Sequence, residues 1–179
     1  MMENAIAWIL IFPLFGSVAC AILGMGNKKI CYPIAVLSMA GSLWAGIETL
    51  RQVIASEEHT ISYIFGGWTL DQYPRGVGIE LYADILGILI TLVVLGVGLI
   101  VAIYSKLPVQ EDTPGKEPLF YTLFLLQITG LAGICLTGDA FNLYVLIEVA
   151  ALTGYGLIAM GSNRAAAATF NYVMLGTIG

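Results

Sequence analysis

A single acidic residue inside a long apolar segment is the position best suited to chemistry. Glu148 stands eight residues into the apolar segment 141–160, which places it about 10 Å along a helix. An ionised carboxylate at that depth in a membrane costs a few kcal/mol or more. Desolvation favours its neutral form, and a nearby cation favours its charged form. Such a group can take up and release protons, so we predict that Glu148 is a proton-transfer acid. The alternative is a structural hydrogen bond to another helix.

Asp84 is a second candidate for proton transfer. It lies in the first turn of the apolar segment 81–104, where a negative charge also stabilises the positive end of the helix dipole. Both roles are open on the sequence alone. His59 stands beside Glu57 and Glu58, but one histidine with two adjacent acids is a weak metal-site pattern. The chain has no Walker loop, GxSxG or HExxH motif, so we expect no soluble active site, no cofactor and no metal site.

The composition indicates that these acids lie within a membrane. Hydrophobic residues make up 59% of the 179-residue chain and charged residues 11%, against roughly 25% charged residues in an ordinary soluble domain. The mean hydropathy is +0.90. These values exclude a soluble enzyme, a disordered tail and a nucleic-acid-binding protein. We therefore expect a multi-pass protein of the cell membrane, surrounded by the lipid bilayer.

Apolar segments of membrane-crossing length recur along the chain. A transmembrane helix needs about 20 mostly apolar residues, and we expect spans at 5–25, 30–50, 81–104, 119–136, 141–160 and 170–179. Residues 1–179 then form the N-terminal part of one all-α transmembrane helix bundle, with five full spans and the start of a sixth. The last segment would rise about 15 Å, half of the membrane core. We interpret the chain as the front part of a longer protein or as one piece of a split subunit.

Two connections carry structure of their own. The loop 56–80 has β-branched and aromatic residues at 60–65, alternation at 77–82, and the turn signals Gly66-Gly67 and Pro74-Arg75-Gly76 between them. This pattern predicts a short β-hairpin. The turn Thr137-Gly138-Asp139 precedes the fifth span, and Asp139 is placed to cap that helix.

Lysine and arginine predict the orientation of the bundle, because short cytoplasmic loops carry more of them. With alternating spans, one side of the membrane has five of these residues and the other has two. The five are Lys28, Lys29, Lys106, Lys116 and Arg164, and the two are Arg51 and Arg75. We therefore expect the N-terminus and the β-hairpin to be extracytoplasmic.

Two motifs resemble a known family. Residues 120–127 read FYTLFLLQ, and residues 136–148 read LTGDAFNLYVLIE. With Gly66-Gly67-Trp68, the segment 78–84 and the segment 170–176, they are similar to the antiporter-like proton-translocating subunits. These are the D-type subunit of Mrp cation/proton antiporters and the related membrane subunits of complex I and membrane-bound hydrogenases. The resemblance covers most of the chain after about residue 62 and is most specific at 139–148.

The resemblance implies a larger bundle with two inverted five-helix repeats, each with a broken helix and a proton half-channel. The family's acid on the fifth helix matches Glu148, and in the family it pairs with a lysine on the seventh helix. Proton movement is coupled to redox chemistry or to cation exchange elsewhere in the complex. The implied partners are other membrane subunits, protons and, in an antiporter, Na⁺.

The sequence departs from the family in two ways that leave its function open. It ends before the seventh helix, and Asn171 stands where many relatives carry a lysine. One hypothesis is a proton or cation/proton translocating subunit of a multisubunit respiratory or Mrp-type complex, either redox-driven or a secondary antiporter. The other is a shortened, non-conducting scaffold subunit of such a complex.

Overall fold

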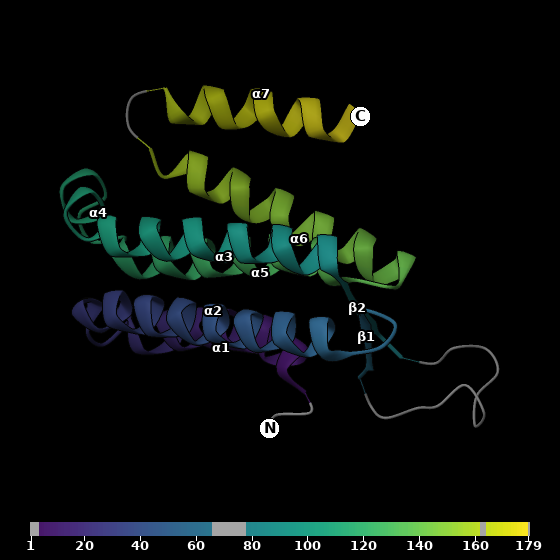
Figure 1. The fold of residues 1–179 in the computed structure, drawn as a ribbon. Coiled ribbons are helices and arrows are strands. Elements are labelled where there is room, and N and C mark those ends of the chain that lie inside the picture. Colours follow the sequence, from purple (N-terminus) through teal and green to yellow (C-terminus); the bar gives the residue numbers. More distant parts are fainter. Residues whose placement is uncertain (1–3, 66–77, 162–163, 179) are drawn as a thin grey trace.

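Long helices lie side by side in the computed structural model, which describes residues 4–65, 78–161 and 164–178. Figure 1 shows α1 and α2 at one face, α3 and α5 in the middle, and α6 and then α7 at the other face. In chain order the elements are α1 (Ala5–Leu23), the 3-10 turn η1 (Lys28–Ile30), α2 (Cys31–Ala55), β1 (Thr60–Ile64), β2 (Glu80–Asp84), α3 (Ile85–Tyr104), α4 (Lys106–Asp112), α5 (Glu117–Leu136), α6 (Ala140–Ala159) and α7 (Ala165–Ile178).

Five helices are long and apolar enough to cross a membrane: α1, η1 with α2, α3, α5 and α6. Their outward faces carry large apolar side chains, such as Phe15 and Ile100, each 68% exposed. Water would disfavour such faces, whereas lipid accepts them. The five full spans predicted from the sequence are therefore confirmed, and the fold is that of a multi-pass membrane protein.

Several predicted boundaries were wrong. Residues 81–84 belong to strand β2 and not to the third span, because they pair with β1. Between the predicted spans 81–104 and 119–136 lies the helix α4, whose Pro108 stands in its first turn, where a helix tolerates proline. Helix α7 begins at Ala165 and not near residue 170, because the four alanines at 165–168 are strong helix formers.

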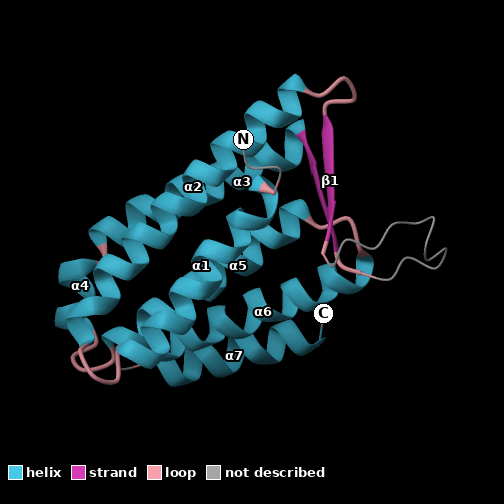
Figure 2. Cartoon of the chain, turned by 90° about the horizontal axis from the view of Figure 1, so that it is seen from below, coloured by secondary structure: helices cyan, strands magenta, loops and turns pink. Residues whose placement is uncertain are grey.

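The predicted hairpin is present as a two-stranded antiparallel sheet. Thr60 pairs with Asp84 at one end of the sheet, and Ile64 pairs with Glu80 at the other. The predicted turn residues at 66–77 lie outside the described residues. Gly138 N donates to the Glu80 carbonyl at 3.0 Å, so the α5–α6 turn lies against the sheet. Figure 2 shows the strands at the end of the bundle opposite α4. The extracytoplasmic side assigned to this end stays a prediction.

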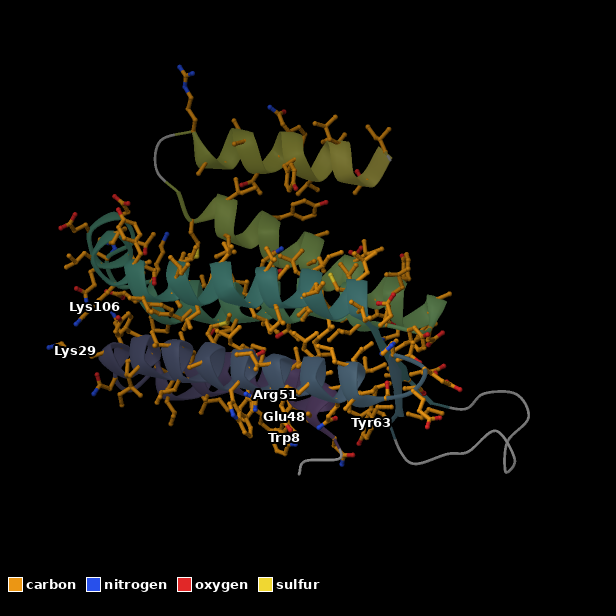
Figure 3. All side chains as sticks on the ribbon, viewed as in Figure 1. Trp8, Lys29, Glu48, Arg51, Tyr63 and Lys106 are labelled. Atoms are coloured by element: carbon orange, nitrogen blue, oxygen red, sulfur yellow. The ribbon has the colours of Figure 1, made fainter. Side chains whose placement is uncertain are left out.

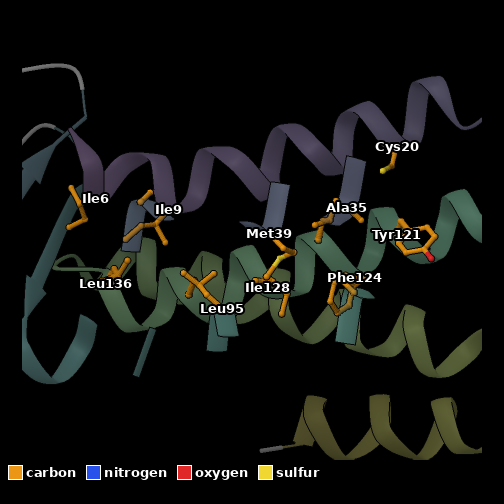
Figure 4. Packing of buried hydrophobic residues seen from close by; sticks show 14 of the residues in the cluster. Ile6, Ile9, Cys20, Ala35, Met39, Leu95, Tyr121, Phe124, Ile128 and Leu136 are labelled. Carbon is orange, nitrogen blue, oxygen red and sulfur yellow. The ribbon is translucent and has the colours of Figure 1, made fainter. Parts of the chain in front are cut away.

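The core lies where α5 passes between α1, α2 and α3. Met39 of α2, Leu95 of α3 and Ile128 of α5 meet there (Figure 4), and the first two are fully buried. Small residues allow the close approach of helices in membranes. A Cβ added at Gly16 of α1 would collide with Ser38 of α2, in agreement with a small residue at this interface.

One polar contact in the core compensates for a proline. Pro13 lies inside α1 and has no N–H to give to the carbonyl four residues before it. That carbonyl belongs to Ile9, and the buried Ser42 hydroxyl of α2 donates to it at 2.6 Å. Because backbone groups in a membrane must be satisfied within the protein, Ser42 both joins α1 to α2 and allows Pro13 inside the helix.

Candidate proton-transfer site on helix α6

The start of α6 is fixed by the predicted cap. The Asp139 carboxylate accepts hydrogen bonds from Phe141 N at 3.1 Å and from Asn142 N at 3.3 Å. The Asn142 side chain donates to Thr137 Oγ1 at 2.9 Å. The capping role predicted for Asp139 is thus confirmed. The turn and the first residues of α6 form one hydrogen-bonded unit, which sets where along the helix each later residue lies.

Close packing against α5 fixes how α6 is rotated about its axis. A Cβ added at Gly130 of α5 would lie 3.0 Å from both Cβ and backbone N of Ala150, so the two backbones approach closely at this point. The Thr153 hydroxyl donates to Gln127 Oε1 of α5 at 2.8 Å. This hydrogen bond joins α6 to α5. The buried face of α6 consists of Asn142, Leu146, Ala150 and Thr153.

Glu148 lies on the opposite face of α6. Successive residues of an α-helix are about 100° apart, so Glu148 stands about 200° from both Leu146 and Ala150. Its side chain is exposed within the chain, and Tyr144 and Leu152 on the same face are 69% and 56% exposed. No described residue forms a hydrogen bond or an ion pair with its carboxylate. The rotation set by α5 therefore presents a carboxylate on the outer face of an apolar helix.

Helix α7 covers the part of this face nearest the C-terminal end of α6. Tyr155 follows Glu148 by seven residues and so shares its face. The Tyr155 and Tyr172 rings make an edge contact at a centroid distance of 5.2 Å, and Tyr155 also contacts Gly176. Asn171 lies on the same helix, α7. Helix α7 therefore covers part of the α6 face that carries Glu148.

Asp84 stands elsewhere and makes a different contact. It is the N-cap residue of α3, and its Oδ1 accepts from Gly87 N at 2.7 Å. A charged side-chain acceptor at a helix N-terminus satisfies a free N–H and stabilises the helix dipole. Among the described residues, no hydrogen bond or ion pair joins Asp84 to Glu148. The structure therefore does not bring the two predicted acids together, and the proton-transfer role of Asp84 stays a prediction.

Thr153 is the polar residue of this region that the sequence analysis did not single out. It is buried and links α6 to α5 through Gln127. A threonine five residues after the acid looks ordinary in an apolar segment, because its hydroxyl can satisfy itself on its own helix, as it does here with the Val149 carbonyl at 2.7 Å. Gln127 ends the motif at residues 120–127, and that motif does not reveal which residue Gln127 bonds.

The structure and sequence are similar to those of known membrane subunits. No family model matches the chain. It is 34% identical over 169 residues to the N-type subunit of the NADH-quinone oxidoreductase of Desulforudis audaxviator, covering 94% of this chain and 32% of that protein. It is 27% identical over 163 residues to the D-type subunit of an Na⁺/H⁺ antiporter of Bacillus subtilis, covering 91% of this chain and 31% of that protein.

A solved structure shows the same likeness. A chain of the membrane-bound sulfane sulfur reductase, an archaeal respiratory membrane complex, superposes with a TM-score of 0.86 at 28% identity. The match covers 98% of this chain and 34% of that one. The chain resembles the N-terminal portion of the antiporter-like membrane subunits. This confirms the resemblance predicted from the two motifs. The chain spans about a third of the length of the curated relatives it matches.

Proposed function

We propose that this chain is the N-terminal portion of a proton or cation/proton translocating membrane subunit of a multisubunit respiratory or Mrp-type complex. In this proposal Glu148 is the intramembrane proton-transfer acid. The observation that carries the proposal is its position: an exposed carboxylate in the middle part of a 20-residue apolar helix, on the face turned away from α5.

Physical chemistry favours a protein or water environment for this carboxylate. An acid that faced lipid tails at this depth would cost a few kcal/mol or more. The Glu148 face therefore meets protein or water and not lipid tails. The contact of α7 with Tyr155 supports this inference, because α7 covers the same face about two turns along the helix from Glu148. A cation supplied from that side would allow the carboxylate to bind and release a proton.

The relatives supply the class of reaction. One is named as a subunit of an NADH-quinone oxidoreductase and another as a subunit of an Na⁺/H⁺ antiporter. Both names describe complexes that act at membranes, one through redox chemistry and one through ion exchange. This chain is similar to a subunit of each complex. We infer that these similar subunits carry out a step common to both complexes, which in this proposal is proton movement through the membrane.

The experiment is a Glu148→Gln substitution in the intact complex, assayed in native membrane vesicles. Gln keeps the size and hydrogen-bonding capacity of the side chain but does not ionise. We expect loss of proton or cation/proton transport with normal assembly of the complex. The matched control is Glu57→Gln, at an exposed acid in the turn after α2, which should transport normally. Normal transport in the Glu148→Gln complex would overturn the proposal and favour the scaffold hypothesis.

A further inference from the structure

A pocket lined by three lysines lies at the end of the bundle opposite the β-hairpin. Its volume is about 840 Å³, and Lys28, Lys29, Lys106, Tyr32, Tyr121 and Glu117 line it. Lys29 and Lys106 are labelled at this end in Figure 3. They come from connections far apart in the sequence, the α1–α2 turn and the start of α4. The sequence predicted only that these lysines lie on the same side of the membrane. The fold brings them together around one pocket.

The ammonium groups in the pocket have no anionic partner of their own. Lys106 Nζ lies 5.2 Å from the centroid of the Tyr32 ring, a cation–π contact that leaves its charge uncompensated. A Cβ added at Gly115 would lie 3.3 Å from Lys28 Nζ, so this lysine rests against the turn before α5. No ion pair within the described parts of the chain involves these lysines. Three cations thus face a shared cavity.

The one carboxylate in the pocket lacks a donor. Glu117 is the first residue of α5, and its Oε2 is buried with no hydrogen-bond partner among the described residues. A buried acceptor left without a donor is costly. The pocket therefore presents three cations together with one acceptor that needs a donor. A ligand with both an anionic group and a hydrogen-bond donor would satisfy all four.

A second cavity at the end of α3 and the start of α4 shares Lys106 with the pocket. Its volume is about 490 Å³, and its other lining residues are Ile103, Tyr104, Leu107, Pro108 and Glu111. Tyr104 is 75% exposed and Leu107 is 65% exposed. The membrane-crossing helices begin or end at this level, at Leu23, Lys28, Tyr104 and Glu117. The pocket thus stands where lipid headgroups lie, with exposed apolar side chains beside it.

We propose that this pocket binds the headgroup of an anionic phospholipid that also carries a hydroxyl donor, of the phosphatidylglycerol type. The phosphodiester lies among Lys28, Lys29 and Lys106, and a glycerol hydroxyl donates to the Glu117 carboxylate. One acyl chain lies against the exposed side chains of Tyr104 and Leu107. Basic pockets between transmembrane helices bind anionic headgroups in this way. The lipid would hold α4 and the α1–α2 turn together and is independent of proton transfer at Glu148.

The test uses the intact complex, purified in detergent, and counts bound phospholipid by native mass spectrometry after delipidation and addition of defined lipids. We compare the wild type with the double variant Lys28→Gln/Lys106→Gln. We expect the variant to lose one tightly bound phosphatidylglycerol per chain, with affinity falling about fivefold for each lysine removed. Lys116→Gln is the matched control, because Lys116 lies just before α5, next to Glu117, but does not line the pocket.

Three results would overturn the proposal. The double variant could retain phosphatidylglycerol with wild-type affinity while assembling normally. Phosphatidylcholine could bind to the wild type equally well, which would mean that the headgroup is not selected. Inorganic phosphate at millimolar concentration could displace the lipid, which would identify a phosphate site instead. Selective retention of phosphatidylglycerol by wild type and the Lys116→Gln control, with loss in the double variant, supports it.

Discussion

At the scale of single residues, a few polar side chains lie where an apolar protein can least tolerate an unsatisfied group. Each has a partner that explains it: Ser42 donates to the carbonyl that Pro13 leaves free, and Thr153 binds Gln127. Glu148 differs from them, since its carboxylate lies in the middle part of an apolar helix and has no partner among the described residues. The contrast is what makes Glu148 informative, because a charged group without a structural partner requires a functional explanation.

The pairing of Ser42 with Pro13 gives a prediction. Ser42→Ala removes the donor to the Ile9 carbonyl and should lower the free energy of unfolding by about 1 kcal/mol. In a Pro13→Ala background, residue 13 regains its N–H and satisfies that carbonyl itself. Ser42→Ala should then cost almost nothing. The measurement is a double-mutant cycle from SDS-induced unfolding of the intact subunit in micelles; equal costs in both backgrounds would contradict this account.

At the scale of elements, caps and close contacts determine where helices begin and how they are rotated. Asp84 and Asp139 start α3 and α6 in the same way, through side-chain acceptors for the first free N–H groups. Gly130 brings α6 near enough to α5 to set its rotation. The direction in which Glu148 points is a consequence of these contacts and not of any contact of its own.

Capping and proton transfer can be separated at Asp84. Asn is as good a helix N-cap as Asp but does not ionise. If capping is its role, Asp84→Asn should retain stability to within a few tenths of a kcal/mol and leave transport unchanged. Asp84→Ala should lose about 1 kcal/mol. Thermal unfolding and vesicle transport, measured on the same preparations, decide the question. Lost transport in a stable Asp84→Asn protein would instead place Asp84 on the proton path.

The α5–α6 contact makes a further prediction at this scale. Gly130→Ala puts a methyl group 3.0 Å from the backbone N of Ala150, which cannot rotate away, and should cost about 1–3 kcal/mol. Gly96→Ala on α3 is the matched control, because a Cβ there meets nothing within 4 Å; it should be neutral or slightly stabilising. Unfolding in micelles measures both. Equal effects of the two substitutions would argue against a close α5–α6 interface.

The sequence predicted elements better than contacts. Long apolar segments identified the five spans, and Asp139 was recognisable as a cap because its type and place before an apolar segment suffice. The start of α3 was placed too early because Leu81, Tyr82 and Ala83 run directly into the apolar segment that follows, and only pairing with β1 distinguishes them. The pairs Ser42–Ile9 and Thr153–Gln127 join residues at least 26 positions apart, so no local pattern could reveal them.

At the scale of the whole molecule, one end of the bundle differs from the other. The α1–α2 turn, α4 and the C-terminal end of α6 share one end, and the two strands and the α5–α6 turn share the other (Figure 1). The lysines gather at the first end, where the lipid pocket is proposed. The face of α6 that carries Glu148 is exposed within the described residues and lies along the side of the bundle, between these two ends.

The central claim is that the carboxyl group of Glu148 carries protons. The most direct measurement is proton flux through the purified, intact complex reconstituted in liposomes, with Glu, Asp or Gln at position 148 as the only difference. We predict a loss of roughly 100-fold for Glu148→Gln, typical of removing a proton-transfer group, and substantial activity for Glu148→Asp. Wild-type flux in the Glu148→Gln complex, fully assembled, would contradict the claim.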